Sequence, residues 1–128
     1  MTLELANRIF LMLTALVFAL FGLWGLFDPD AMVNGFGIAL TTGEGRTLIR
    51  ASYGGFLIGA AAVFALCGSD NTMVRIGNLA VIALTAPILL SRAFGVLIDG
   101  GAVNQHLLYL AIEAIGIALA GWFWLRGR

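Results

Sequence analysis

Four long runs of apolar residues occupy most of this sequence, and they constrain its fold more than any other feature. A helix that crosses a bilayer needs about 20 mainly apolar residues, and such runs cover residues 5–27, 47–66, 73–98 and 105–125. Only 11% of the residues are charged and 61% are hydrophobic, whereas soluble domains contain about 25% charged residues. The sequence therefore predicts an all-α integral membrane protein, an antiparallel four-helix bundle in a single transmembrane domain of residues 1–128.

The connections between these runs are short. Asp28-Pro29 ends the first run, because proline cannot continue a helix but suits the first turn of another, with Asp28 as its N-cap. Residues 31–38 then contain Gly35 and Gly37. We expect a short interfacial turn there, followed by a loop.

The charge balance and the rare residue types exclude several classes of function. Seven arginines balance seven acidic residues, and lysine is absent, so there is no polybasic tail for nucleic acid. The sequence contains one cysteine, Cys67, and one histidine, His106. A single cysteine excludes an internal disulfide, and neither residue type provides the pair that a metal signature needs. We therefore expect no metal, no cofactor and no nucleic-acid partner, and we assign no catalytic residue.

Two charged residues flank the last connection at matching distances. Arg92 lies ten positions before Ala102, and Glu113 lies eleven positions after it. In antiparallel helices with a rise of 1.5 Å per residue, both charges would lie about 10–12 Å inside the helix end. Ionisable residues at such depth usually pair with one another, so we predict that Arg92 and Glu113 form an intramembrane polar pair.

Other polar residues fall on the same predicted helix faces. Thr85, Arg92 and Asp99 are spaced by seven, and the fourth run places further polar residues at i, i+3 and i+7. The predicted network, with contributions from three helices, comprises Arg50, Tyr53, Arg92, Asp99, His106, Tyr109 and Glu113. Two interpretations remain open: a pocket that binds an anionic group through its arginines, or a buried salt-bridge network that fixes helix register.

Small residues predict where helices approach each other closely. Gly55 and Gly59 are four residues apart, the spacing of small-xxx-small helix contacts. We assign Gly54 and Gly116 to helix packing as well. Pro87 falls in the middle of the third run, where it removes one backbone hydrogen bond.

The distribution of arginine predicts the orientation in the membrane. The side that holds both termini carries most of them, namely Arg8, Arg75, Arg126 and Arg128. Only Arg46 lies in a connection on the opposite side. The positive-inside rule therefore predicts that both termini are cytoplasmic and that the polar network lies in the outer half of the membrane.

Several stretches resemble a bacterial family of small four-helix membrane proteins that contain a domain of unknown function. They are Gly25-Leu-Phe-Asp-Pro-Asp-Ala-Met, Arg50-Ala-Ser-Tyr-Gly-Gly-Phe-Leu-Ile-Gly and Arg92-Ala-Phe-Gly-Val-Leu-Ile-Asp-Gly, together with Glu113. The Arg-x-x-Tyr-Gly-Gly string is the most specific of them. The resemblance covers nearly the whole chain and implies a four-helix membrane bundle in the bacterial inner membrane. It implies no activity.

Three functions compete on these observations. The first is a non-enzymatic accessory or structural subunit that docks on a larger inner-membrane complex. The expected partners are the lipid bilayer and either other membrane protein subunits or further copies of the chain in a homo-oligomer. The second is a small-ligand binder or carrier, with an outer polar pocket for an anionic lipid, a quinone-like molecule or a hydrophobic acid. The third is a membrane enzyme that acts on a lipid through acid–base groups. The second and third both need the polar network to meet a guest molecule in the lipid bilayer.

Overall fold

The structure is a computed structural model that describes residues 2–100 and 103–127, with the side chains of all of these except residues 103–105. The described residues form helical segments and no strand. In chain order these are α1 (Leu3–Phe27), α2 (Pro29–Asn34), α3 (Gly43–Ile49), the π-helix η1 (Arg50–Gly55), α4 (Phe56–Ser69), α5 (Val74–Asp99) and α6 (Val103–Arg126). The centre of the last connection, at Ala102, and Arg128 lie outside the described residues.

Four of the described helical spans are long and apolar enough to cross a membrane, which confirms the predicted fold class. They are Leu3–Phe27, Gly43–Ser69, Val74–Asp99 and His106–Arg126. The second span begins earlier than predicted, because α3, η1 and α4 follow one another without a break. Its start is set by Thr42, whose hydroxyl accepts a hydrogen bond from the Gly45 amide at 3.1 Å.

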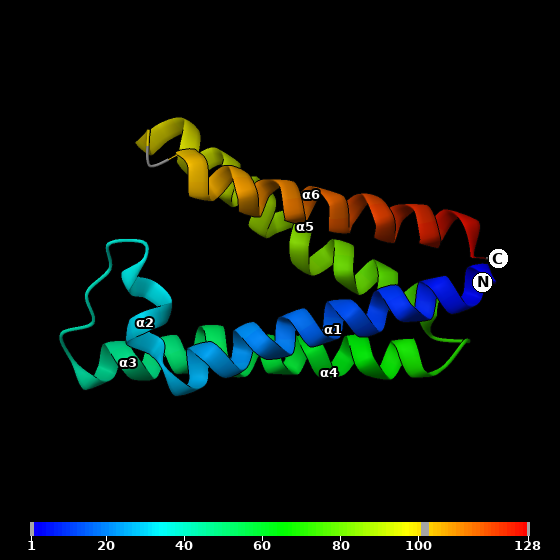
Figure 1. Cartoon of the computed structure of the whole chain (residues 1–128), viewed down its shortest axis with the longest axis horizontal. Coiled ribbons are helices and arrows are strands. Elements are labelled where there is room, and N and C mark those ends of the chain that lie inside the picture. The colour runs from blue at the N-terminus through cyan, green and yellow to red at the C-terminus, as the bar shows by residue number, and fades with distance from the viewer. Residues whose placement is uncertain (1, 101–102, 128) are drawn as a thin grey trace.

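The helices are arranged as two antiparallel pairs, α1 with α4 and α5 with α6 (Figure 1). The pairs meet at the end where α1 begins and α6 ends, which we call the terminal end. They diverge toward the opposite end, which holds α2, α3 and the end of α5 (Figure 1). We call this the distal end.

The buried core lies at the terminal end, where all four long helices meet. Its members come from every one of them: Leu11, Ala15, Ala60, Phe64, Cys67, Val81 and Ala120. Asn7 and Asn78 lie beside this core, and the Asn78 amide donates a hydrogen bond of 2.9 Å to Asn7. Both are almost fully buried. This contact joins α1 to α5 deep in the packed half of the molecule, where a polar group without a partner would be costly.

The connection from α4 to α5 is fastened by an arginine of the first helix. Arg8 donates from Nε to the Gly68 carbonyl at 2.9 Å and from Nη2 to the Ser69 carbonyl at 3.1 Å. These carbonyls belong to the last turn of α4, where no amide of the helix donates a hydrogen bond to them. Arg8 therefore caps α4 and holds the start of α1 against it.

The close crossing of α1 and η1 depends on glycine, at positions that differ in part from those predicted. A Cβ on Gly54 would lie 3.0 Å from the backbone Cα and N of Leu26, and Gly22 of α1 faces the same crossing. Gly54, one of the glycines assigned to helix packing, therefore lies at this close approach of η1 to α1. The predictions for Gly59 and Gly116 are not met by the described residues, none of which lies within 4 Å of a Cβ built on either glycine. Gly55 also lies away from the crossing, because only one face of the helix turns toward α1.

The predicted turn after the first run is confirmed as α2. The Asp28 carboxylate accepts a hydrogen bond from the Ala31 amide at 3.1 Å, and Pro29 occupies the first turn. Gly37 follows with a φ of 75°, a left-handed conformation that favours glycine. These residues turn the chain sharply at the end of α1.

Candidate functional site

Arg92 of α5 and Glu113 of α6 form an ion pair, as their distances from the connection predicted. The shortest contact is 2.9 Å, from Arg92 Nη2 to Glu113 Oε1. Arg92 Nε also donates to both carboxylate oxygens, at 3.2 and 3.3 Å. The two side chains are 21% and 14% exposed. Two charges of opposite sign therefore neutralise each other inside the candidate membrane spans, where an unpaired charge would be unstable.

Two aromatic residues of α6 complete the surroundings of Arg92. The Tyr109 ring centroid lies 4.9 Å from the guanidinium carbon, a cation–π contact. His106 Nδ1 lies 3.4 Å from Arg92 Nη1, within hydrogen-bond range when Nδ1 carries no proton. Arg92, His106, Tyr109 and Glu113 thus form one cluster, which we call the Arg92 cluster.

Phe36, in the loop after α2, packs against this cluster and was not among the residues predicted from the sequence. Its ring centroid lies 6.0 Å from that of His106 and 6.1 Å from that of Tyr109. It therefore connects the α1–α2 corner to the start of α6 at the distal end, where the helix pairs diverge. No sequence signal identifies it, because where a loop residue lands depends on the packing of the helices around it.

An open cleft of about 530 Å³ lies against the Arg92 cluster. Its apolar lining residues include Pro87, Ile88 and Val96, and its polar lining residues are Ser91, Arg92, Asp99 and His106. Residues 87 to 99 extend about 18 Å along α5 at the helical rise. The cleft therefore runs from the distal end of α5 to well inside the candidate span.

Asp99 lies at the distal mouth of this cleft and is separate from the ion pair. It is exposed at the last position of α5, and the next residue, Gly100, has a left-handed φ of 60°. Within the part of the chain whose side chains are described, no side chain donates a hydrogen bond to it. Asp99 therefore lines the same cleft as Arg92 but does not compete with Glu113 for the Arg92 guanidinium.

Arg50 and Tyr53 lie outside the Arg92 cluster, so the predicted network of three helices was wrong for these two residues. Arg50 Nε donates to the Leu26 carbonyl at the end of α1, at 3.0 Å. The Tyr53 side chain is about half exposed, and its Cβ lies beside Gly25 of α1. The reason is that η1 packs on α1, and sequence spacing alone does not say which helix a polar face will meet.

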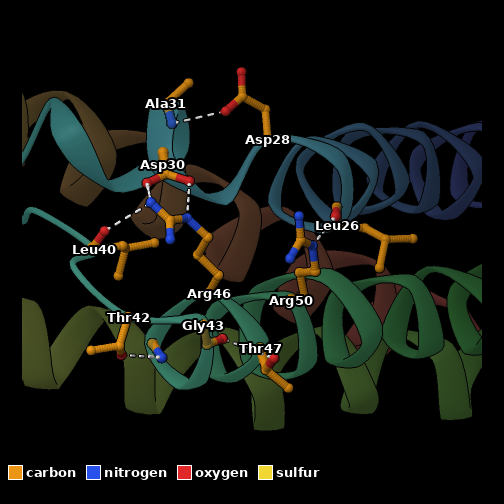
Figure 2. A network of polar contacts seen from close by, with 11 residues as sticks. Leu26, Asp28, Asp30, Ala31, Leu40, Thr42, Gly43, Arg46, Thr47 and Arg50 are labelled. Atoms are coloured by element: carbon orange, nitrogen blue, oxygen red, sulfur yellow. Dashed lines mark hydrogen bonds and ion pairs between the residues drawn. The ribbon is translucent and has the colours of Figure 1, made fainter.

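A second polar cluster joins α2, its following loop and α3 (Figure 2). Arg46 donates two hydrogen bonds to Asp30, at 2.8 and 3.1 Å, and a third to the Leu40 carbonyl at 3.0 Å. In Figure 2 Arg46 and Arg50 both project from the α3–η1 segment toward α1 and α2. The Arg46 guanidinium lowers the pKa of the Asp30 carboxyl below its ordinary value of 3.8. This second cluster holds the distal loop in place. None of its residues lines the cleft beside the Arg92 cluster.

Two buried polar side chains extend the polar stripe of α5 toward the terminal end. Asn78, Thr85, Arg92 and Asp99 follow one another at intervals of seven. The Asn78 side-chain oxygen and the Thr85 hydroxyl are buried without a hydrogen-bond partner among the described residues. Asn78 was missed although the same spacing of seven identifies it.

The polar groups that the cleft offers to a guest are the Ser91 hydroxyl, the Arg92 guanidinium, the Asp99 carboxylate and the His106 ring. Among the described residues, no group of three His, Cys, Asp or Glu side chains could hold a metal ion. The Glu113 carboxylate accepts three hydrogen bonds from Arg92. Arg92 therefore engages both oxygens of the carboxylate, and the Glu113 side chain is 14% exposed.

Fold and cleft together define a small multi-pass membrane protein with four candidate membrane helices and an ion pair beside an open cleft. Residues 6–125 match the family described as Domain of unknown function (DUF4345), and the chain belongs to this family. No curated protein and no solved structure matches the chain. Family membership covers all four long helices and names no activity, so the functional argument depends on the cleft.

Proposed function

We propose that this protein binds a small amphipathic molecule in the distal cleft and performs no chemistry on it. The observation that carries the proposal is the lining of the cleft, where Ser91, Arg92, Asp99 and His106 share one space with an apolar wall. Binding sites for small molecules typically have 300–1,000 Å³ and are mainly apolar with a few convergent polar groups. The cleft of about 530 Å³ has this size and this lining.

The exposure of the ion pair supports binding over a purely structural role. A salt bridge that serves only to fix helix register is best enclosed between the helices, away from any cleft. Arg92 instead lines the cleft, and its side chain keeps 21% exposure. A polar group at this position can interact with a guest while Glu113 keeps the arginine neutralised.

A variant that fills the cleft tests the proposal. Gly95 lines the cleft, and among the described residues a Cβ there would meet only the Asp99 carboxylate, at 3.8 Å. Gly95→Phe should therefore fold and should occupy the cleft. Gly59→Phe is the matched control, since Gly59 has open space around it and does not line the cleft.

Native mass spectrometry of protein purified from membranes in an uncharged detergent is the measurement. We expect wild type and Gly59→Phe to retain a small molecule of constant mass, and Gly95→Phe to lose it. Equal retention by all three proteins, or by none, would refute binding in the cleft.

A second proposal is an accessory subunit that docks on a larger membrane complex. It is favoured by apolar side chains such as Leu90, Phe94 and Leu97, which are strongly exposed on the distal half of α5. Lipid can cover this surface as well as protein can. Extraction in a mild detergent followed by native-size analysis tests docking: a partner should co-purify. A monodisperse species of one or two 13.5 kDa chains would contradict it.

We further propose the bacterial inner membrane as the location, with both termini in the cytoplasm. Arg8, Arg75 and Arg126 lie at the terminal end, whereas Arg46 at the distal end is paired with Asp30. Labelling of single cysteines tests this in a Cys67→Ser background. A membrane-impermeant maleimide should label Thr41→Cys in intact cells, and Asn71→Cys only after lysis. The reverse pattern would overturn the orientation.

A further inference from the structure

We propose that the polar head of the molecule bound in the cleft carries a positive charge, and that Asp99 is its partner. The inference rests on the proposed function and adds the chemical class of the guest. It differs from the expectation drawn from the sequence, in which arginines bind an anion. Arg92, the positive charge of the cleft lining, is already paired with Glu113, whereas Asp99 is not part of that ion pair.

Arg92 has little capacity left for an anion. Its Nε and Nη2 donate to Glu113, its Nη1 faces His106, and the Tyr109 ring lies against the guanidinium. An incoming carboxylate or phosphate would have to displace Glu113. It would then leave that carboxylate without its partner inside a candidate span, which is strongly unfavourable.

Asp99 supplies the one charge of the described cleft lining that no described side chain balances. Arg92 and Glu113 form an ion pair and cancel, and the formal charge count adds no charge for the remaining polar lining residues, Ser91 and His106. The net charge of the cluster and lining is therefore one negative charge.

The position of Asp99 in its helix strengthens the negative potential. Asp99 is the last residue of α5, where the helix dipole contributes partial negative charge and a cation is favoured. An acidic residue at a helix C-terminus costs stability without a compensating cation. Such a departure from local preference is typical of a functional position.

The layout of the cleft then orients the guest. Asp99 and His106 lie at the distal mouth, and Pro87 and Ile88 lie about 18 Å and 16 Å from Asp99 along the helix axis. A cationic head would lie at the mouth, and an apolar body would follow the wall of α5 inward. Ser91 and the neutral ion pair lie between these two regions and can accept or donate hydrogen bonds.

The test uses two ions of the same shape and opposite charge, tetraphenylphosphonium and tetraphenylborate. Equilibrium dialysis of the purified protein in an uncharged detergent, corrected for protein-free micelles, gives saturable binding of each. We expect saturable binding of the cation and none of the anion. Asp99→Asn should weaken binding of the cation about tenfold, because it removes the charge that attracts the cation.

Matched variants separate this inference from the proposed function. Glu4→Gln changes the net charge equally at the terminal end and should leave binding unchanged, while Asp99→Glu should restore it. Preference for the anion, or unchanged binding of the cation by Asp99→Asn, would overturn the inference even if Gly95→Phe abolishes binding. Binding that survives Gly95→Phe would refute the cleft itself as the binding site.

Discussion

At the scale of single residues, Arg92 is the best defined part of the site, because each of its three guanidinium nitrogens faces a partner and an aromatic ring lies against the group. Two of its nitrogen atoms donate hydrogen bonds to Glu113, and the third faces His106. The Tyr109 ring lies against the guanidinium group. Such a fully used arginine binds its neighbours strongly but has little affinity left for another anion. The site is therefore polar without being positively charged.

The ion pair predicts a strongly non-additive double-mutant cycle. Arg92→Gln alone leaves Glu113 charged and unpaired, so we expect a loss of about 3 kcal/mol of stability. The double variant Arg92→Gln/Glu113→Gln should lose less than the sum of the single variants, with a coupling of about 1–3 kcal/mol. Unfolding of the detergent-solubilised proteins gives these values. Additive losses would mean that the two side chains do not interact.

The residue scale also separates what could be predicted from what could not. The Arg92–Glu113 pair could be predicted by counting residues outward from one short connection. In two consecutive antiparallel helices, residues equally far from that connection lie at the same depth in the membrane. Arg50 was predicted at the same end of the molecule as Arg92, where it lies, but its partner is the Leu26 carbonyl and not the Arg92 cluster. Its helix packs on α1, and the choice of neighbour depends on Gly54, Gly22 and Leu26 fitting together in three dimensions.

At the scale of elements, the crossing of α1 and η1 determines where the second span lies. Gly54 brings η1 against the backbone of Leu26, and Arg50 of the same segment caps the end of α1. A π-helix at this point rotates the residues before it relative to α4. The small-residue spacing in the sequence indicated a close contact in this helix, but it could not identify Gly54 as its centre.

A pair of alanine substitutions tests this crossing. In Gly54→Ala the new Cβ would lie 3.0 Å from the backbone of Leu26, so we expect a loss of about 1–3 kcal/mol from overpacking. In Gly59→Ala the new Cβ meets no described residue within 4 Å, so the change should be neutral or stabilising by up to about 1 kcal/mol. Thermal unfolding followed by circular dichroism compares the two. Equal stabilities would contradict the close approach of α1 and η1.

The loop between α2 and α3 depends on its ion pair, and this predicts a pH dependence. The hydrogen bond from Arg46 lowers the pKa of Asp30 below 3.8, so the folded state favours the charged carboxylate. The pair therefore contributes stability above pH 3.8, and this contribution is lost as the pH falls through the lowered pKa.

A carboxyl NMR titration measures this directly. The midpoint for Asp30 should lie below 3.8 in wild type and should rise in Arg46→Gln. In Arg50→Gln it should rise less, because Arg50 acts on Asp30 only through its charge. A midpoint that does not move in Arg46→Gln would show that the pair is absent in solution.

At the scale of the whole molecule, the two helix pairs are packed at the terminal end and diverge at the distal end (Figure 1). The buried core and the Asn7–Asn78 hydrogen bond hold the terminal end together. The distal ends are linked in part by Phe36, against His106 and Tyr109. Four long apolar runs were enough to predict four helices, but this divergence was not predictable, because apolar residues that face lipid and apolar residues that face a helix look alike in the sequence.

The aromatic contact of Phe36 predicts how far the pairs separate. Each aromatic pair contributes about 0.5–1.5 kcal/mol, so Phe36→Ala should lengthen and broaden the distance between the distal ends of the two pairs. Spin labels at Thr47→Cys and Phe94→Cys in a Cys67→Ser background report that distance by pulsed electron resonance. Phe27→Ala, an exposed residue at the end of α1, is the control. Identical distributions for all variants would show that Phe36 does not hold the pairs together.

The central claim is that the cleft beside Arg92 holds a small molecule, and a density map tests it most directly. The protein should be purified with its native lipids and imaged at side-chain resolution, with a fiducial binder attached at the terminal end. The account predicts density that no side chain explains, extending from Asp99 past Ser91 toward Pro87, with Arg92 still bound to Glu113. A cleft closed by movement of α5 onto α1, or filled by a side chain of this protein, would contradict it.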